Sequence, residues 1–129
     1  MNKIERFEDI VAWQKARILT REIYAATKIG QFAKDFGLKG QIQRASVSSM
    51  ANIAEGFERG GDNEFIQFLS TAKGSSGEVK SHLYVALDQQ YVSPGAFNQL
   101  YANADEVSRL IGGFMAYLSE SQLRGRKFK

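Results

Sequence analysis

Cysteine is absent from the 129-residue sequence, which excludes disulfides and thiolate metal sites. The absence is consistent with a reducing compartment, and we expect a cytoplasmic protein. The opening residues, MNKIERFED, are charged and lack the apolar segment of a signal peptide, so no secretory leader is expected. No apolar run approaches the roughly 20 residues that span a bilayer. We therefore expect no membrane partner.

Proline and histidine occur only once each. With one proline and long stretches rich in Ala, Leu, Glu, Lys, Arg and Gln, the chain is expected to be helical nearly throughout. His82 has no second metal ligand at a matching spacing, and the serines have no histidine base beside them. The sequence therefore predicts no catalytic residue, metal, cofactor or small-molecule substrate, and a protein that is not an enzyme.

Apolar periodicity predicts a four-helix domain over residues 1–121, followed by a basic, disordered tail at 122–129. The helices are expected over about 8–28, from Leu38 to the Gly60-Gly61 stop, from Asp62 or Asn63, and from Ser93-Pro94 to about 121. The segment KGSSGE at 73–78 is interpreted as helix because the apolar stripe keeps its phase on both sides. Short connections favour an all-α, up-down-up-down four-helix bundle.

The first predicted helix has two apolar stripes. The core stripe of this first helix includes Trp13 and Leu19. For comparison, the predicted core stripe of the third helix extends to Gln90. A helix in a lone bundle needs only one such stripe. The second stripe is either a local contact with scattered surface residues or a subunit interface of a cyclic homo-oligomer. It consists of Phe7, Val11, Ile18 and Ala25.

The second predicted helix is apolar or small over most of its circumference and carries one polar stripe. Spacings of three and four residues align the members of this stripe on one side of the helix. A helix this apolar is expected to be surrounded, so the stripe should be partly buried and hydrogen-bonded to neighbouring helices. It consists of Gln41, Arg44, Ser48, Asn52, Glu55 and Arg59.

Charge is unevenly distributed along the chain. The net charge is +3, but without the last six residues, RGRKFK, it is −1. Residues 1–61 carry a net charge of +3 and residues 62–123 carry −4. The basic regions are candidates for RNA contact, although the two halves could also neutralise each other within or between subunits. The candidate contacts are Lys15, Arg17, Arg21, Lys28, Arg124, Arg126, Lys127 and Lys129.

The segments FEDIVAWQKA, QIQRASVSSMANIAEGFERG and EFIQFLSTAKGSSGEV resemble the four-helix-bundle proteins encoded within intervening sequences of bacterial 23S rRNA genes. The resemblance covers roughly residues 7–118. It implies a homo-oligomer, often a pentamer, without established enzyme activity. It also implies similarity in fold to the accessory variability determinant of diversity-generating retroelements, which binds nucleic acid. Met50 and Ser49 stand where many members have proline and isoleucine, so less kinking and a more polar packing position are expected here.

Two functions remain open from the sequence. One is a non-enzymatic oligomeric scaffold that associates with RNA or other nucleic acid through its basic surface and tail. The other is an assembly or adaptor protein with protein partners only. No basic recognition helix or zinc finger is evident, so any nucleic-acid binding is expected to be insensitive to base sequence.

Overall fold

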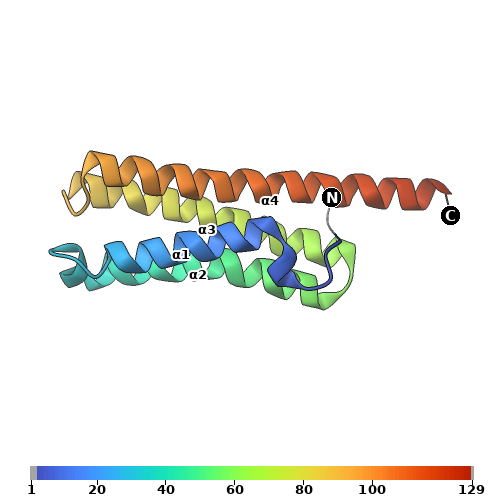
Figure 1. Cartoon of the computed structure of the whole chain (residues 1–129), viewed down its shortest axis with the longest axis horizontal. Helices are drawn as coiled ribbons and strands as arrows, with labels where there is room; N and C mark the ends of the chain where they lie inside the picture. The colour runs from blue at the N-terminus through green and yellow to red at the C-terminus, as the bar shows by residue number, and fades with distance from the viewer. Residues whose placement is uncertain (1–2, 129) are drawn as a thin grey trace.

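Figure 1 shows a computed structural model that describes the backbone of residues 3–128 and the side chains of residues 3–121. Its four long helices are α1 (Val11–Ala26), α2 (Phe36–Arg59), α3 (Asp62–Asp88) and α4 (Pro94–Phe128). Short 3-10 helices, η1 (Phe7–Asp9) and η2 (Phe32–Lys34), precede α1 and α2. No strand occurs within the described range, so the predicted all-α fold is confirmed. No helix there is both long enough and apolar enough to cross a membrane.

Each long helix packs against two others. α2 contacts α1 and α3, and α4 likewise contacts α3 and α1, so α1 and α3 occupy opposite corners. In Figure 1 the connections between successive helices lie at alternate ends, and α4 projects beyond the other three helices at its C-terminal end. The outward faces of α1 and α3 therefore point to opposite sides of the molecule.

Local chemistry explains the helix boundaries. The Asp35 carboxylate caps α2 by accepting a hydrogen bond from the Leu38 N–H at 3.0 Å. Gly60 follows α2 with a φ of 86°, a left-handed conformation that favours glycine. Ser93 Oγ accepts a hydrogen bond from the Ala96 N–H at 3.1 Å at the start of α4. The predicted stop at Gly60 and start at Ser93-Pro94 are thus confirmed.

Several boundaries differ from the prediction. α1 begins at Val11, because the residues before it form η1. Gly61 is the N-cap of α3, so Asp62 lies in the first turn, where its charge interacts favourably with the helix dipole, and is not the cap. α4 continues past Ser121 through Phe128. The reason is that no proline follows Ser121 and Gln, Leu, Arg and Lys favour helix.

The core is formed by one stripe from each helix. The segment at 73–78 is helical, as predicted, and Ser76 within it is fully buried. Trp13 is only half-buried, and Gln90 is exposed beyond the end of α3 with a φ of 61°. Gln90 therefore lies outside the core, whereas Trp13 packs against the core as a partly buried residue. The large, fully buried side chains include Leu19, Ile23, Phe32, Ile42, Ile53, Leu69, Leu83 and Ile111.

α2 and α3 approach closely where Gly56 faces Phe65 and Phe68. A Cβ atom on Gly56 would lie 2.7 Å from Phe68 Cβ and 2.8 Å from Phe65 Cδ1, well inside van der Waals contact. The Phe65 ring also makes edge-to-face contacts with Phe57 and Phe114, at centroid distances of 6.1 and 5.4 Å. Since Phe65 is held on several sides, Gly56 sets the spacing of the two helices.

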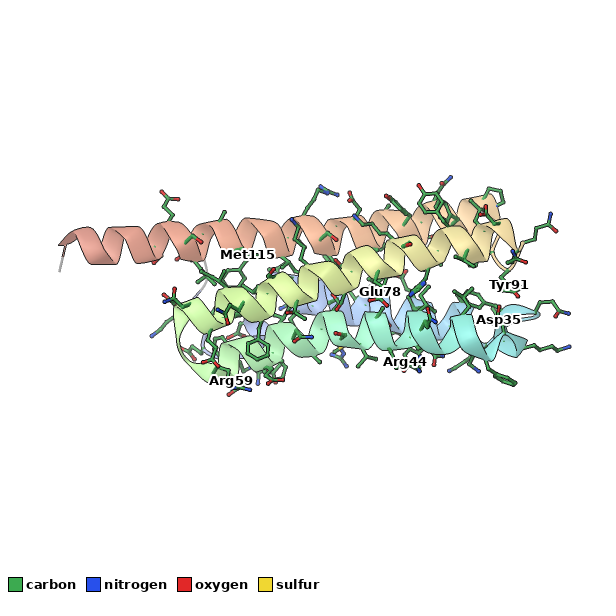
Figure 2. The ribbon with its side chains drawn as sticks, turned by 180° about the vertical axis from the view of Figure 1, so that it is seen from behind. Asp35, Arg44, Arg59, Glu78, Tyr91 and Met115 are labelled. Atoms are coloured by element: carbon green, nitrogen blue, oxygen red, sulfur yellow. The ribbon has the colours of Figure 1, made fainter. Side chains whose placement is uncertain are left out.

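At the other end of the bundle, Asp35 and Tyr91 join two connections (Figure 2). Tyr91 Oη donates a hydrogen bond to Asp35 Oδ2 at 2.9 Å, and its ring stacks on Phe32 at 5.3 Å. Hydrogen bonds from the Leu38 N–H and the Tyr91 hydroxyl lower the pKa of Asp35. The bond to Asp35 in turn raises the pKa of Tyr91. This contact ties the α1–α2 connection to the α3–α4 connection.

We expect Gly56→Ala to lower the free energy of unfolding by about 1–3 kcal/mol, because overpacking outweighs the gain in helix propensity of about 1 kcal/mol. Gly74→Ala is the matched control. Gly74 is exposed in the middle of α3, and apart from its chain neighbours and the backbone of its own helix no described atom lies within 4 Å of its Cβ position. This variant should be more stable by about 0.5–1 kcal/mol. Denaturant unfolding compares the two, and equal stability of both variants would contradict the tight contact.

Candidate functional site

The polar stripe of α2 runs along the seam between α2 and α3. Ser48 Oγ and Ser75 Oγ are hydrogen-bonded across this seam at 2.9 Å. Asn52 Nδ2 donates to the backbone oxygen and to the Oγ of Ser48, at 2.8 and 3.0 Å. Ser48 and Asn52 are half-buried, and Ser75 is buried. The middle of the stripe therefore forms a hydrogen-bonded network between the two helices.

The charged members of the stripe are exposed, which corrects the expectation of burial. Arg59 donates hydrogen bonds to Glu55 at 2.8 Å and to Glu64 at 3.2 Å. The hydrogen bond to Glu55 and the charge of Glu64 raise the pKa of Arg59. Gln41 and Arg44 are also exposed, and Arg44 makes no ion pair with a described residue (Figure 2). The physical reason is that α1 and α3 cover only two sides of α2.

Ser49 is a buried polar residue whose side chain lacks a partner. Its residue exposure is 0%, and its Oγ has no hydrogen bond within the described part of the protein. Other buried hydroxyls are satisfied. Ser46 Oγ donates to the backbone oxygen of Gln43 at 2.9 Å, and Ser76 Oγ lies 2.5 Å from Ser108 Oγ. An unpaired buried hydroxyl costs about 1–3 kcal/mol, so Ser49 is a weak point of the core.

The predicted interface stripe of α1 is divided in two. Phe7 lies in η1, half-buried, with its ring 5.0 Å from that of Trp13. Val11 and Ile18 are 53% and 40% exposed, and Ala25 is exposed as well. In the single chain, these last three residues form an exposed apolar face, at the start of which Val11 lines a groove shared with α4.

The basic residues predicted on α1 also lie on different sides. Lys15 Nζ is 3.8 Å from Glu106 Oε1, so Lys15 faces α4. Arg17, Arg21 and Lys28 are exposed, and spacings of four and seven residues place them together on another side of α1. Only these three of the four candidates therefore share a surface.

Further cations that were not among the predicted contacts lie on η2 and α2. Residues 10–54 carry seven Lys/Arg against two Asp/Glu, and 36–54 contain no acidic residue. Counting charge over windows shorter than half the chain would have revealed this excess. Apart from Lys15, none of these seven cations forms an ion pair with a described residue, and all but the half-buried Lys39 are exposed. Six of them are called the basic α1–α2 surface, and of these Arg44 also belongs to the polar stripe of α2: Arg17, Arg21, Lys28, Lys34, Lys39 and Arg44.

Other candidate positions offer less. His82 Nε2 lies 3.3 Å from Glu78 Oε2 on α3. No group of three His, Cys, Asp or Glu side chains suited to a metal gathers among the described residues. Two open grooves, of about 550 and 400 Å³, lie where α4 leaves the bundle. Four predicted nucleic-acid contacts of the tail lie outside the described side chains: Arg124, Arg126, Lys127 and Lys129.

The fold and these surfaces define a helical-bundle protein with a polar interhelical seam and a separate basic surface. The chain belongs to the 23S rRNA-intervening sequence protein family, whose model matches residues 8–113. It is similar to a crystal structure of a protein of unknown function from the S23 ribosomal protein family of Bacteroides thetaiotaomicron, with a TM-score of 0.75 and 20% identity. That match covers 82% of this chain and 96% of the other, and it concerns the fold. No match was found among curated protein sequences.

Adjacent serines should respond in opposite ways to alanine. Ser48→Ala is expected to lower the free energy of unfolding by about 1–3 kcal/mol, because Ser75 Oγ loses its partner across the seam. Ser49→Ala is expected to raise it by about 1 kcal/mol, because an unpaired buried hydroxyl is removed. Thermal unfolding measures both, with Glu55→Ala as an exposed control that stays near wild type. Destabilisation by Ser49→Ala would show that its hydroxyl has a partner.

Proposed function

We propose that the protein is a non-enzymatic, homo-oligomeric scaffold that binds RNA through the basic α1–α2 surface. The observation that carries this proposal is a set of six cations without an ion-pair partner among the described residues. A cluster of uncompensated positive charge attracts a polyanion, and each phosphate contact releases a condensed counterion. Residues 10–54 alone carry a net charge of +5, although the whole chain carries +3.

The oligomer in this proposal is a ring of up-down-up-down bundles. The proposed oligomer is based on the exposed apolar face of Val11, Ile18 and Ala25 on α1. The resemblance to intervening-sequence proteins suggests five subunits. Cyclic symmetry would repeat the basic α1–α2 surface around an axis, so that individually weak phosphate contacts act together.

RNA binding of this kind would depend on phosphates and not on base identity. The basic surface is built from helices that already pack in the bundle, and neither a zinc site nor an aromatic sheet occurs in the described residues. The tail cations remain additional candidates for phosphate contact. A scaffold with protein partners only is the second candidate, favoured by the exposed apolar side chains of α1.

The assembly should have a mass several times the 14.4 kDa of one chain. Ile18→Glu should lower this mass, because a charge in an apolar interface loses its hydration. Val85→Glu is the matched control, since Val85 is 43% exposed on α3, away from the α1 face. Light scattering at micromolar concentration measures both. A wild-type mass of 14.4 kDa would contradict the oligomer.

Arg17→Ala/Arg21→Ala should weaken the binding of structured RNA and make it less dependent on salt. Each phosphate contact contributes about 0.7 to the logarithmic salt slope for single strands, and the double variant removes two potential contacts. The double variant Lys15→Ala/Lys73→Ala serves as the control, because it also removes two positive charges but leaves the basic α1–α2 surface unchanged. Fluorescence anisotropy over a salt series measures affinity and slope for each variant.

A chain ending at Leu123 tests the tail in the same assay. If Arg17→Ala/Arg21→Ala leaves affinity and slope unchanged while truncation abolishes binding, RNA is held by the tail and not by the basic α1–α2 surface. If the full-length protein does not bind RNA at low salt, the scaffold with protein partners only is the correct function.

A further inference from the structure

The end of the bundle from which α4 projects is acidic. Residues 3–9 and 55–64 meet there, because η1 packs against α2 (Figure 1). Together the two segments carry seven Asp/Glu and three Lys/Arg, a net charge of −4. Glu58 and Asp62 are exposed and make no ion pair with a described residue. This end therefore attracts a basic partner.

Apolar side chains line two open grooves at the same end. The larger groove, of about 550 Å³, lies between the α2–α3 turn and α4 and includes Phe57 and Phe65. The smaller, of about 400 Å³, lies between the start of α1 and α4. Ile4, Phe114 and Tyr117 line both, so the grooves meet at the base of the projecting part of α4. Tyr117 is 49% exposed there.

The projecting part of α4 has the opposite charge. α4 is 35 residues long, whereas α3, the next longest helix, has 27. From Leu118, the last core residue of α4, the helix continues for roughly 15 Å to Phe128 at 1.5 Å per residue. Residues 122–129 contain four Lys/Arg, no Asp/Glu and the apolar residues Leu123 and Phe128. Figure 1 shows that the backbone of this part of α4 extends away from the acidic end of the same chain.

We propose that the projecting end of α4 docks on the acidic, grooved end of a second copy of this chain. In a two-fold arrangement, two projecting helices lie antiparallel, and each chain places its tail beside the other's grooves. The +4 tail then meets a surface of −4, and both contacts form at once because a two-fold interface is self-complementary. This inference rests on the homo-oligomeric part of the proposed function, and its contact shares only Val11 of the smaller groove with the α1 face.

Charge exchange tests this contact. The tail variant carries Arg124→Glu, Arg126→Glu and Lys127→Glu, and the end variant carries Glu58→Lys and Asp62→Lys. Each variant alone should weaken end-to-end association by more than about tenfold, because like charges then face each other. A chain with both sets of changes restores opposite charges and should regain association. Sedimentation over a concentration and salt series measures the change, and circular dichroism confirms that each variant is folded.

The outcomes separate this inference from the proposed function. Docking of α4 on a second copy is supported if the tail variant and the end variant each lose association and the combined variant regains it. Unchanged association in both single sets, or no recovery in the combined variant, overturns it. RNA binding by the tail variant is measured in parallel. If that variant loses RNA binding but keeps its association, the tail contacts RNA and the docking inference is wrong. The variant Ile18→Glu tests the α1 face in a separate measurement.

Discussion

The close contact between α2 and α3 is the constraint on which the rest of the structure depends. Gly56 lets the two helices approach at one end, and the Ser48–Ser75 hydrogen bond joins them near the middle. Together these contacts fix the rotation of α2 about its axis. With that rotation, Ile42 is fully buried and Arg44 reaches solvent. The same packing therefore sets both the core and the position of one cation of the basic α1–α2 surface.

Charge segregation is the second organising feature of this protein. Residues 10–54 carry a net +5, whereas the end formed by 3–9 and 55–64 carries −4. Within 126 residues of described backbone these excesses lie on different parts of one bundle and largely cancel in the total. A small net charge thus conceals two surfaces of opposite sign. Such surfaces are suited to different partners, which is why one is proposed to bind RNA and the other a basic protein segment.

Features determined by neighbouring residues were predictable from the sequence. The helix stop at Gly60, the start at Ser93-Pro94 and the helical state of 73–78 depend on local backbone chemistry and on the phase of one apolar stripe. The family membership was also predicted and is confirmed by the match over residues 8–113. These features require no knowledge of how the helices meet.

Features that depend on helix rotation and on distant contacts were not predictable. The exposure of Glu55 follows from the side of α2 that α3 covers, which periodicity alone does not specify. Asp35 and Tyr91 are 56 positions apart, and Lys15 meets Glu106 on a different helix. Ser49 was recognised as a polar packing position, but only the surrounding atoms show that its hydroxyl is unpaired.

The arrangement of ion pairs gives a physical reason to distinguish structural charges from charges available for binding. Arg59 is held between Glu55 and Glu64, so its charge is already neutralised within the chain. Arg17 and Arg21 have no carboxylate partner among the described residues, and the Arg17 guanidinium lies 5.9 Å from the centroid of the Trp13 ring. Their charges are therefore available to a polyanion. Removing these two cations should therefore leave the fold intact, so that a loss of RNA affinity reports on binding and not on unfolding.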